Sequence, residues 1–206
     1  MKRRFTAWIA PWLAALLVSC SVAHAAVFNY SVFLSGPSEF PVNASAGTGT
    51  GSVIYDDVAH TLGLQISFSG LTGTTTASHL HAPTVISGVG TEAQASAAMN
   101  AGVATTTPSL VGFPLGVTSG TFSNTLDLTM ASSWNAAYVT ANGGTTAGAE
   151  SALAAALAAG KSYWNVHSDT FPGGEIRGFP TIIPEPATWM LCLLALAPLC
   201  VKRRRQ

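Results

Sequence analysis

Residues 163–179 read YWNVHSDTFPGGEIRGF. Apolar residues occupy alternate positions in 163–167 and again at the start of 175–179, as expected for strands with one buried face. The sequence Pro172-Gly173-Gly174 between them is typical of a turn. We therefore predict that residues 163–167 and 175–179 pair as an antiparallel hairpin.

The chain before this hairpin continues the β pattern. Apolar residues alternate with polar ones in 28–34 and 62–68, and residues 51–56 and 56–60 supply a further strand and a turn. A less regular alternation in 121–130 predicts one more strand, while helical signals are confined to 147–159 and, more weakly, to 91–100 and 132–142. Such spacing predicts a mainly β domain, a Greek-key, immunoglobulin-like β-sandwich with one or two short helices.

The first 25 residues have the parts of a secretory signal peptide. Residues 2–4 are basic, residues 5–18 are apolar, and Ala23-His24-Ala25 offers small residues ahead of a cleavage between Ala25 and Ala26. Residues 17–20 also resemble a bacterial lipobox, in which Cys20 would be lipidated. Cleavage after Ala25 is the favoured interpretation.

Residues 184–206 form a tail with three parts. Pro184, Glu185 and Pro186 come first, residues 187–201 carry no charge, and residues 202–205 are basic. The uncharged stretch is slightly short for a membrane span, and the basic cluster would stay on the cytoplasmic side. We predict a signal peptide over 1–25, a domain over 26–183 and a separate tail over 184–206 that is held in the inner membrane.

The charges of the 206-residue chain are few and unevenly placed. Only 9% of residues are charged and the formal net charge is zero, but the predicted domain holds eight acids against two bases, a balance of −6. That balance excludes nucleic acid as a partner. Cys20, Cys192 and Cys200 all lie in the terminal segments, so the predicted domain forms no disulfide and depends on its core.

Three predicted strands carry two polar side chains each, two positions apart. Side chains at positions i and i+2 share one face of a strand, and the last hairpin makes two of the pairs neighbours. All six groups converge if the first of these strands lies beside that hairpin. The pairs are His79 and His81, Asn165 and His167, and Glu175 and Arg177.

Two interpretations of this cluster remain open. In the first, His79, His81 and His167 bind copper or zinc, with Glu175 or Asp169 as a further ligand or supporting group, because imidazole suits these metals. In the second, the polar groups form a hydrogen-bonded network, with an ion pair between Glu175 and Arg177 and histidines that donate to backbone carbonyls.

Several segments resemble the CHRD domain, a module of the developmental protein chordin and of bacterial exported proteins. They are LSGPSEFP at 34–41, SHLHA at 78–82, YWNVH at 163–167 and PGGEIRG at 172–178. The resemblance spans roughly residues 27–179, and it implies an extracellular β-rich domain with no established enzymatic activity.

The tail resembles the PEP-CTERM sorting signal of Gram-negative bacteria, on its Pro-Glu-Pro motif, short apolar stretch and Arg-rich end. This resemblance implies that an exosortase-type protease removes the tail and releases the protein to the cell surface or an exopolysaccharide matrix. Export machinery, that protease and extracellular polysaccharide are the expected partners.

We therefore expect a non-catalytic binding or structural protein of the cell envelope. A metalloprotein with His79, His81 and His167 as ligands, with or without redox activity, is the alternative. A carbohydrate-active enzyme is less favoured because the acids are scattered rather than paired. The aromatic residues that either line a sugar-binding surface or pack in the core are Trp134, Tyr138, Tyr163 and Trp164.

Overall fold

The computed structural model describes residues 26–83 and 100–184, and these residues form a mainly antiparallel β structure with two short helices, as predicted. Most strands coincide with the alternating segments of the sequence. The strands are β1 (Val27–Ser35), β2 (Thr48–Asp56), β3 (Thr61–Ser69), β4 (Thr75–His81), β5 (Gly120–Asp127), β6 (Tyr163–Ser168), β7 (Ile176–Gly178) and β8 (Thr181–Ile182). The helices are α1 (Ala136–Ala141) and α2 (Thr146–Ala158), with single 3-10 turns at Gly36–Ser38 and Ala131–Ser133.

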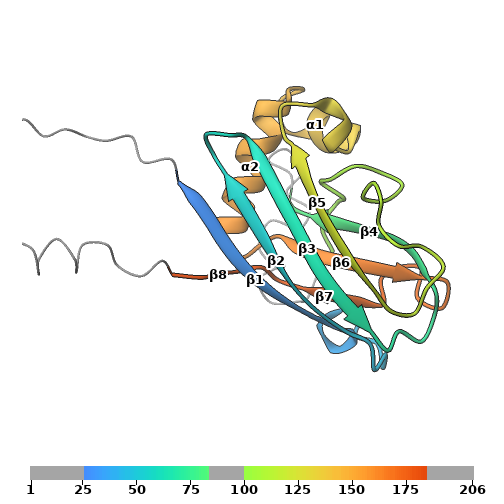
Figure 1. The fold of residues 1–206 in the computed structure, drawn as a ribbon. Coiled ribbons are helices and arrows are strands. Elements are labelled where there is room, and N and C mark those ends of the chain that lie inside the picture. Colours follow the sequence, from blue (N-terminus) through green and yellow to red (C-terminus); the bar gives the residue numbers. More distant parts are fainter. Residues whose placement is uncertain (1–25, 84–99, 185–206) are drawn as a thin grey trace, which may run out of the picture.

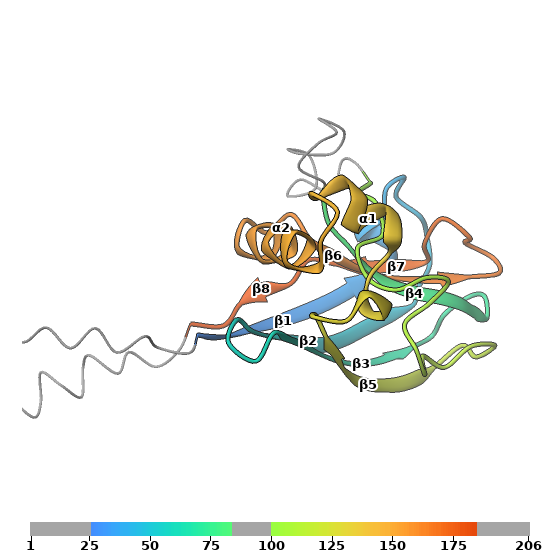
Figure 2. The same cartoon turned by 90° about the horizontal axis from the view of Figure 1, so that it is seen from above.

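All the strands belong to one curled sheet, which corrects the expected division into the two sheets of a sandwich. The strand order is β4-β6-β7-β1-β2-β3-β5, and β8 pairs with β1 outside this path. Strands β1 and β7 pair at one residue only, Ser35 with Arg177. That narrow junction lets the short strands turn across the long ones, so that one continuous sheet encloses the core (Figures 1 and 2).

The long strands β1, β2, β3 and β5 bury one face only. In β3, Leu62, Leu64, Ile66 and Phe68 are buried at alternate positions, as expected when helices and short strands cover a single face. Figure 2 shows α1, α2 and the strands β4, β6 and β7 on the same side of the long strands. The alternation also fixes the register of β3, because a shift of one residue in its pairing would turn this row of apolar side chains to the solvent.

Helix α2 begins and ends where the sequence indicates. The Thr145 hydroxyl accepts a hydrogen bond from the Gly148 N–H at the N-terminus. Gly160 follows the helix with φ of 65°, a left-handed conformation that glycine adopts at helix ends. The helix buries Leu153 and Leu157 against the sheet. The second predicted helix, over 91–100, lies outside the described residues except for Asn100.

Strands β4, β6 and β7 differ from the long strands because most of their residues are buried on both faces. One face carries Leu80, Trp164, Val166 and Ile176 into the hydrophobic core. The opposite face carries polar side chains that are nevertheless buried. Burying polar groups costs free energy unless they find partners, so this face requires an explanation beyond packing.

The two ends of the described domain lie side by side. Strand β8 pairs with the first half of β1 through Tyr30 and Ile182, and the Ile183 N–H donates to the Asn29 carbonyl over 2.7 Å. Figure 1 shows the start of β1 and the end of β8 at the same side of the molecule. Pro184 is exposed just beyond them.

The remaining terminal predictions fall beyond the described residues. Ala25, Glu185 and Pro186 are among them, whereas Ala26 is described. Within 26–83 and 100–184, no helix combines the length and the apolar character needed to cross a membrane.

Candidate functional site

Strands β4, β6 and β7 bring five of the six polar side chains of the predicted pairs onto one face, whereas Glu175 precedes β7 and its carboxylate bonds elsewhere. His79 lies opposite Asn165 across the β4–β6 pair, and Asn165 lies opposite Arg177 across the β6–β7 pair. His81 lies opposite Tyr163 in the same register. Directly opposed residues of antiparallel strands share a face, so the condition under which the sequence expected these groups to converge, β4 beside the last hairpin, is met.

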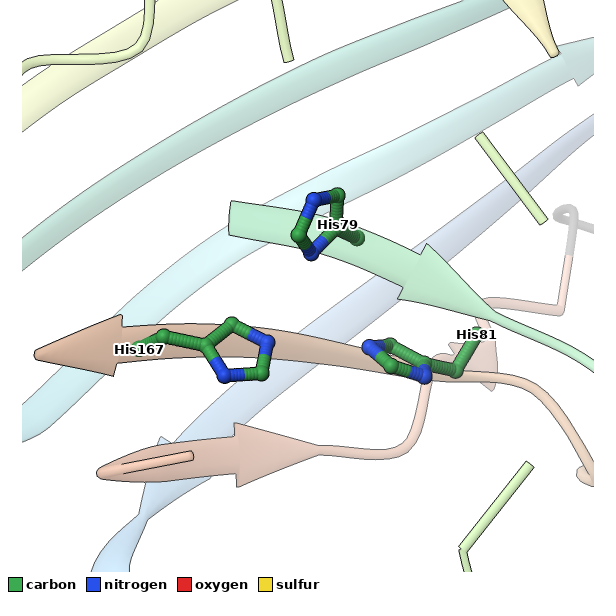
Figure 3. A group of neighbouring side chains, drawn as sticks. All are labelled: His79, His81 and His167. Atoms are coloured by element: carbon green, nitrogen blue, oxygen red, sulfur yellow. The ribbon is translucent and has the colours of Figure 1, made fainter. Parts of the chain in front are cut away.

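The three histidines form a cluster on this face. One ring nitrogen from each of His79, His81 and His167 lies within 4.8 Å of those of the other two. The ring centroids of His79 and His167 are 5.4 Å apart, and both other pairs are separated by about the same distance, 5.9 and 6.0 Å. Figure 3 shows the rings from two strands turned toward a common space between them.

Each histidine is held by one backbone carbonyl. A carbonyl oxygen can only accept, so the bonded nitrogen carries the hydrogen and the other ring nitrogen keeps its lone pair. Such bonds orient a ring and fix its tautomer, as they do around metal-binding histidines. The bonds run from His79 Nε2 to Pro108 O (2.7 Å), from His81 Nδ1 to Ala101 O (2.9 Å) and from His167 Nδ1 to Pro172 O (2.9 Å).

The second ring nitrogens, His79 Nδ1, His81 Nε2 and His167 Nε2, are buried and have no hydrogen-bond partner among the described residues. Burial lowers the pKa of all three histidines, and that of His81 falls to about 3. The rings are therefore neutral at pH 7, which is the form that ligates a metal. Three free lone pairs in one space are the donor set of a three-histidine metal site.

Glu175 and Asp169, the expected additional ligands, are engaged elsewhere. The Glu175 carboxylate accepts hydrogen bonds from the Ser45 hydroxyl (2.6 Å) and from the N–H groups of Thr72 and Gly73. Burial acts to raise the Glu175 pKa, but hydrogen bonding by Ser168, Ser45, Thr72 and Gly73 outweighs it and the pKa is lowered. Asp169 is exposed and accepts from Thr74, so neither carboxylate joins the histidine cluster.

The ion pair on this face also differs from the prediction. Arg177, which is fully buried, lies 3.9 Å from the Glu39 carboxylate and not in the expected pair with Glu175. Its guanidinium also bonds Asn100 Oδ1 at 2.9 Å and covers the Tyr163 ring, which in turn stacks on His81. The polar network of the second interpretation thus exists beside the histidines, with Glu39 as its acid.

Sequence reasoning missed Glu39, which is 2% exposed. It follows the 3-10 turn at Gly36–Ser38, outside any strand, and it lies 3.5 Å from Asn165 Nδ2. Burial raises the Glu39 pKa to about 7, although the Arg177 guanidinium acts in the opposite direction. The signal that could have found it is an acid placed between prolines in the segment GPSEFP.

The four aromatic residues weighed as a sugar-binding surface are all buried, three of them in the hydrophobic core and Tyr163 between Arg177 and His81 on the histidine face. Their exposed fractions range from 0 to 4%, and the Trp134 and Tyr138 rings stack on each other at 6.0 Å. They are Trp134, Tyr138, Tyr163 and Trp164. They stabilise the fold and leave the histidine face as the candidate site.

Comparison with known proteins gives one match. A family model described as the CHRD domain matches residues 30–179, the segment that contains every residue of the candidate site. No curated protein and no solved structure matches the chain.

Proposed function

Since the chain belongs to the CHRD domain family, we propose that it is a metal-binding member, in which His79, His81 and His167 hold a zinc or copper ion. The observation that carries this proposal is the convergence of three buried ring nitrogens without partners. Buried polar groups in native proteins almost always have a partner, and an ion between these nitrogens supplies one to all three. Three protein ligands leave a fourth position open, as in catalytic rather than structural zinc sites.

The test is metal binding by residues 26–184, which contain the whole described core. Metal-free protein is dialysed separately against zinc and copper(II), and the retained metal is counted by elemental analysis. We expect one ion per chain. Bound metal at one hundred times its dissociation constant should stabilise the fold by about 2.7 kcal/mol, which is about 5–10 °C in the midpoint of thermal unfolding for a domain of this size.

Two variants make the test specific. His167→Ala, at the least buried of the three histidines, should lose the ion and the metal-dependent rise in the unfolding midpoint. His60→Ala, a half-exposed histidine outside the cluster, should keep both. A wild-type domain that retains no metal, or a His167→Ala variant that retains it fully, contradicts the proposal and leaves the hydrogen-bonded network as the role of these residues.

We further propose that the protein is exported, with a signal peptide cleaved between Ala25 and Ala26, and sorted through its tail by an exosortase-type protease. It would then act at the cell surface or in an extracellular polysaccharide matrix. Two observations support this: the family occurs in exported proteins, and the Pro184-Glu185-Pro186 motif begins two positions after Ile182 in the sequence, directly after the last strand. Intact-mass measurement of the released protein tests it: a product that ends at Gln206 contradicts tail removal, and a lipid on Cys20 contradicts the cleavage site.

A further inference from the structure

The described residues contain five buried side-chain atoms that have no hydrogen-bond partner, and all five belong to this one region. Three are the histidine nitrogens, and the other two are acceptor oxygens, Glu39 Oε1 and Asn165 Oδ1. Unsatisfied buried groups are rare in native structures, and a cluster of them points to a missing water molecule or ion. The three-histidine ion accounts for the nitrogens but not for the two oxygens.

The two oxygens lie next to each other and next to the histidines. The atoms nearest to a Cβ placed on Gly174 would be Asn165 Nδ2, Asn165 Oδ1 and Glu39 Oε1, at 2.5, 2.6 and 2.8 Å, so both oxygens lie against the Gly174 backbone and close to each other. Asn165 is the direct cross-strand partner of His79 and lies two positions from His167 on the same face. The two oxygens therefore adjoin the proposed metal site.

The charges around the two oxygens favour a metal-bound water molecule beside them. Three neutral imidazoles add no negative charge, so a divalent ion would bring two positive charges beside the buried Arg177. Glu39 is the carboxylate in contact with that arginine. A water molecule bound to such an ion becomes acidic, and its two hydrogens need acceptors.

On the basis of the metal site proposed above, we propose that the ion carries a water molecule or hydroxide as its fourth ligand, held by Glu39 Oε1 and Asn165 Oδ1. The three nitrogens bind the ion and the two oxygens accept the hydrogens of the water, so all five atoms gain a partner. Glu39 is then the group that takes the proton when the water becomes hydroxide: one O–H bond of the water breaks and one O–H bond forms on the carboxylate.

A pocket of about 390 Å³ opens at the surface beside Glu39 and Gly174. Glu39 and Gly174 line it together with Phe40, Val42 and Phe171. Phe40 and Val42 are exposed, and polar residues such as Asn43, Asn100 and Thr170 complete the lining. The histidines and Asn165 do not line this pocket, so a small anion that displaces the water would enter past Glu39.

Azide is the probe, because it binds metals as an anion and has no hydrogen to donate. The copper(II)-loaded chain is titrated with azide at pH 8, and the azide-to-copper charge-transfer absorption gives the affinity. Glu39→Gln removes a negative charge beside the fourth position, and at an effective dielectric constant of about 20 it should tighten azide binding roughly tenfold or more. Metal stoichiometry should stay at one, because Glu39 is not a ligand.

A second variant makes the opposite change in charge, and its result does not depend on whether the first variant folds. Asn165→Asp adds a negative charge at the same place and should weaken azide binding roughly tenfold or more. Asp127→Asn, which removes one negative charge at the exposed end of β5, is the matched control for Glu39→Gln and should leave the azide affinity unchanged. Circular dichroism and thermal unfolding establish that each variant is folded.

The outcomes separate this inference from the proposed function. Failure of the wild-type chain to bind metal overturns both. Metal binding with an azide affinity that stays within twofold of wild type in Glu39→Gln or in Asn165→Asp overturns the fourth-ligand assignment and leaves the three-histidine site standing.

Discussion

Replacing Arg177 by methionine should destabilise the domain more than most single substitutions. The methionine keeps much of the side-chain volume but removes the positive charge and every guanidinium hydrogen bond. Glu39 then remains buried without its cation, and the carbonyl of Ser38 and the Asn100 side chain each lose a donor. The perturbation is thus electrostatic, and the packing of the core stays almost intact.

The expected magnitude follows from the burial and the distance. At 3.9 Å, with an effective dielectric constant of about 20, the Arg177–Glu39 attraction is about 4 kcal/mol. Glu39 relieves part of the loss by taking up a proton, because without the guanidinium its already raised pKa rises further. Adding the lost hydrogen bonds, we expect a decrease of about 3–5 kcal/mol in the free energy of unfolding.

Urea unfolding followed by tryptophan fluorescence measures this loss, and a double-mutant cycle assigns it. The Arg177→Met and Glu39→Gln substitutions should couple by about 1–3 kcal/mol, because each removes the other's partner. Glu175→Gln is the matched control, and it should add to Arg177→Met within about 0.5 kcal/mol. A loss below about 1 kcal/mol in Arg177→Met, or a stronger coupling with Glu175 than with Glu39, would refute the reasoning.

Two further substitutions test other parts of the structure. Gly178→Ala should cost more than about 2 kcal/mol in urea unfolding, because the added Cβ would overlap the Phe33 carbonyl oxygen, whereas Gly173→Ala, with open space around it, should cost little. The hydrogen bond and charge of Glu150 raise the pKa of His60 above its usual 6.5, so the stabilisation from this pair is full below that value and is lost as the pH rises through the raised pKa. His60→Gln should therefore reduce stability clearly at pH 5.5 and hardly at pH 9; equal losses at both would contradict the assignment.

Local periodicity was enough to predict most strands and the convergence of the histidines. A period of two places His79 and His81 on one face of β4, and the Pro172-Gly173-Gly174 turn lets β6 and β7 pair as neighbours. These features depend on neighbours in sequence or on one assumed strand pair. They could be predicted because each side chain's direction follows from the backbone alone.

The closure of the sheet and the role of Glu39 could not be predicted in this way. The single sheet depends on the junction of Ser35 with Arg177, a pair far apart in sequence that no alternation encodes. Glu39 lies in irregular backbone and contacts Asn165 across 126 positions of the chain. Without a repeating pattern, an isolated acid in a loop is indistinguishable from a solvated one, and only the fold reveals its burial.

The pairing of β8 with β1 places both ends of the described domain at the same end of the molecule, so anything joined to either terminus attaches at this one pole. Because Ile183 bonds to Asn29, a fusion partner placed ahead of Val27 and one placed after Ile183 would crowd the same pole and leave the opposite one clear. An affinity tag or surface linkage at either end would therefore immobilise the domain in one orientation. For the same reason, a short peptide from residue 183 back to residue 27 would close the backbone into a ring without displacing a strand.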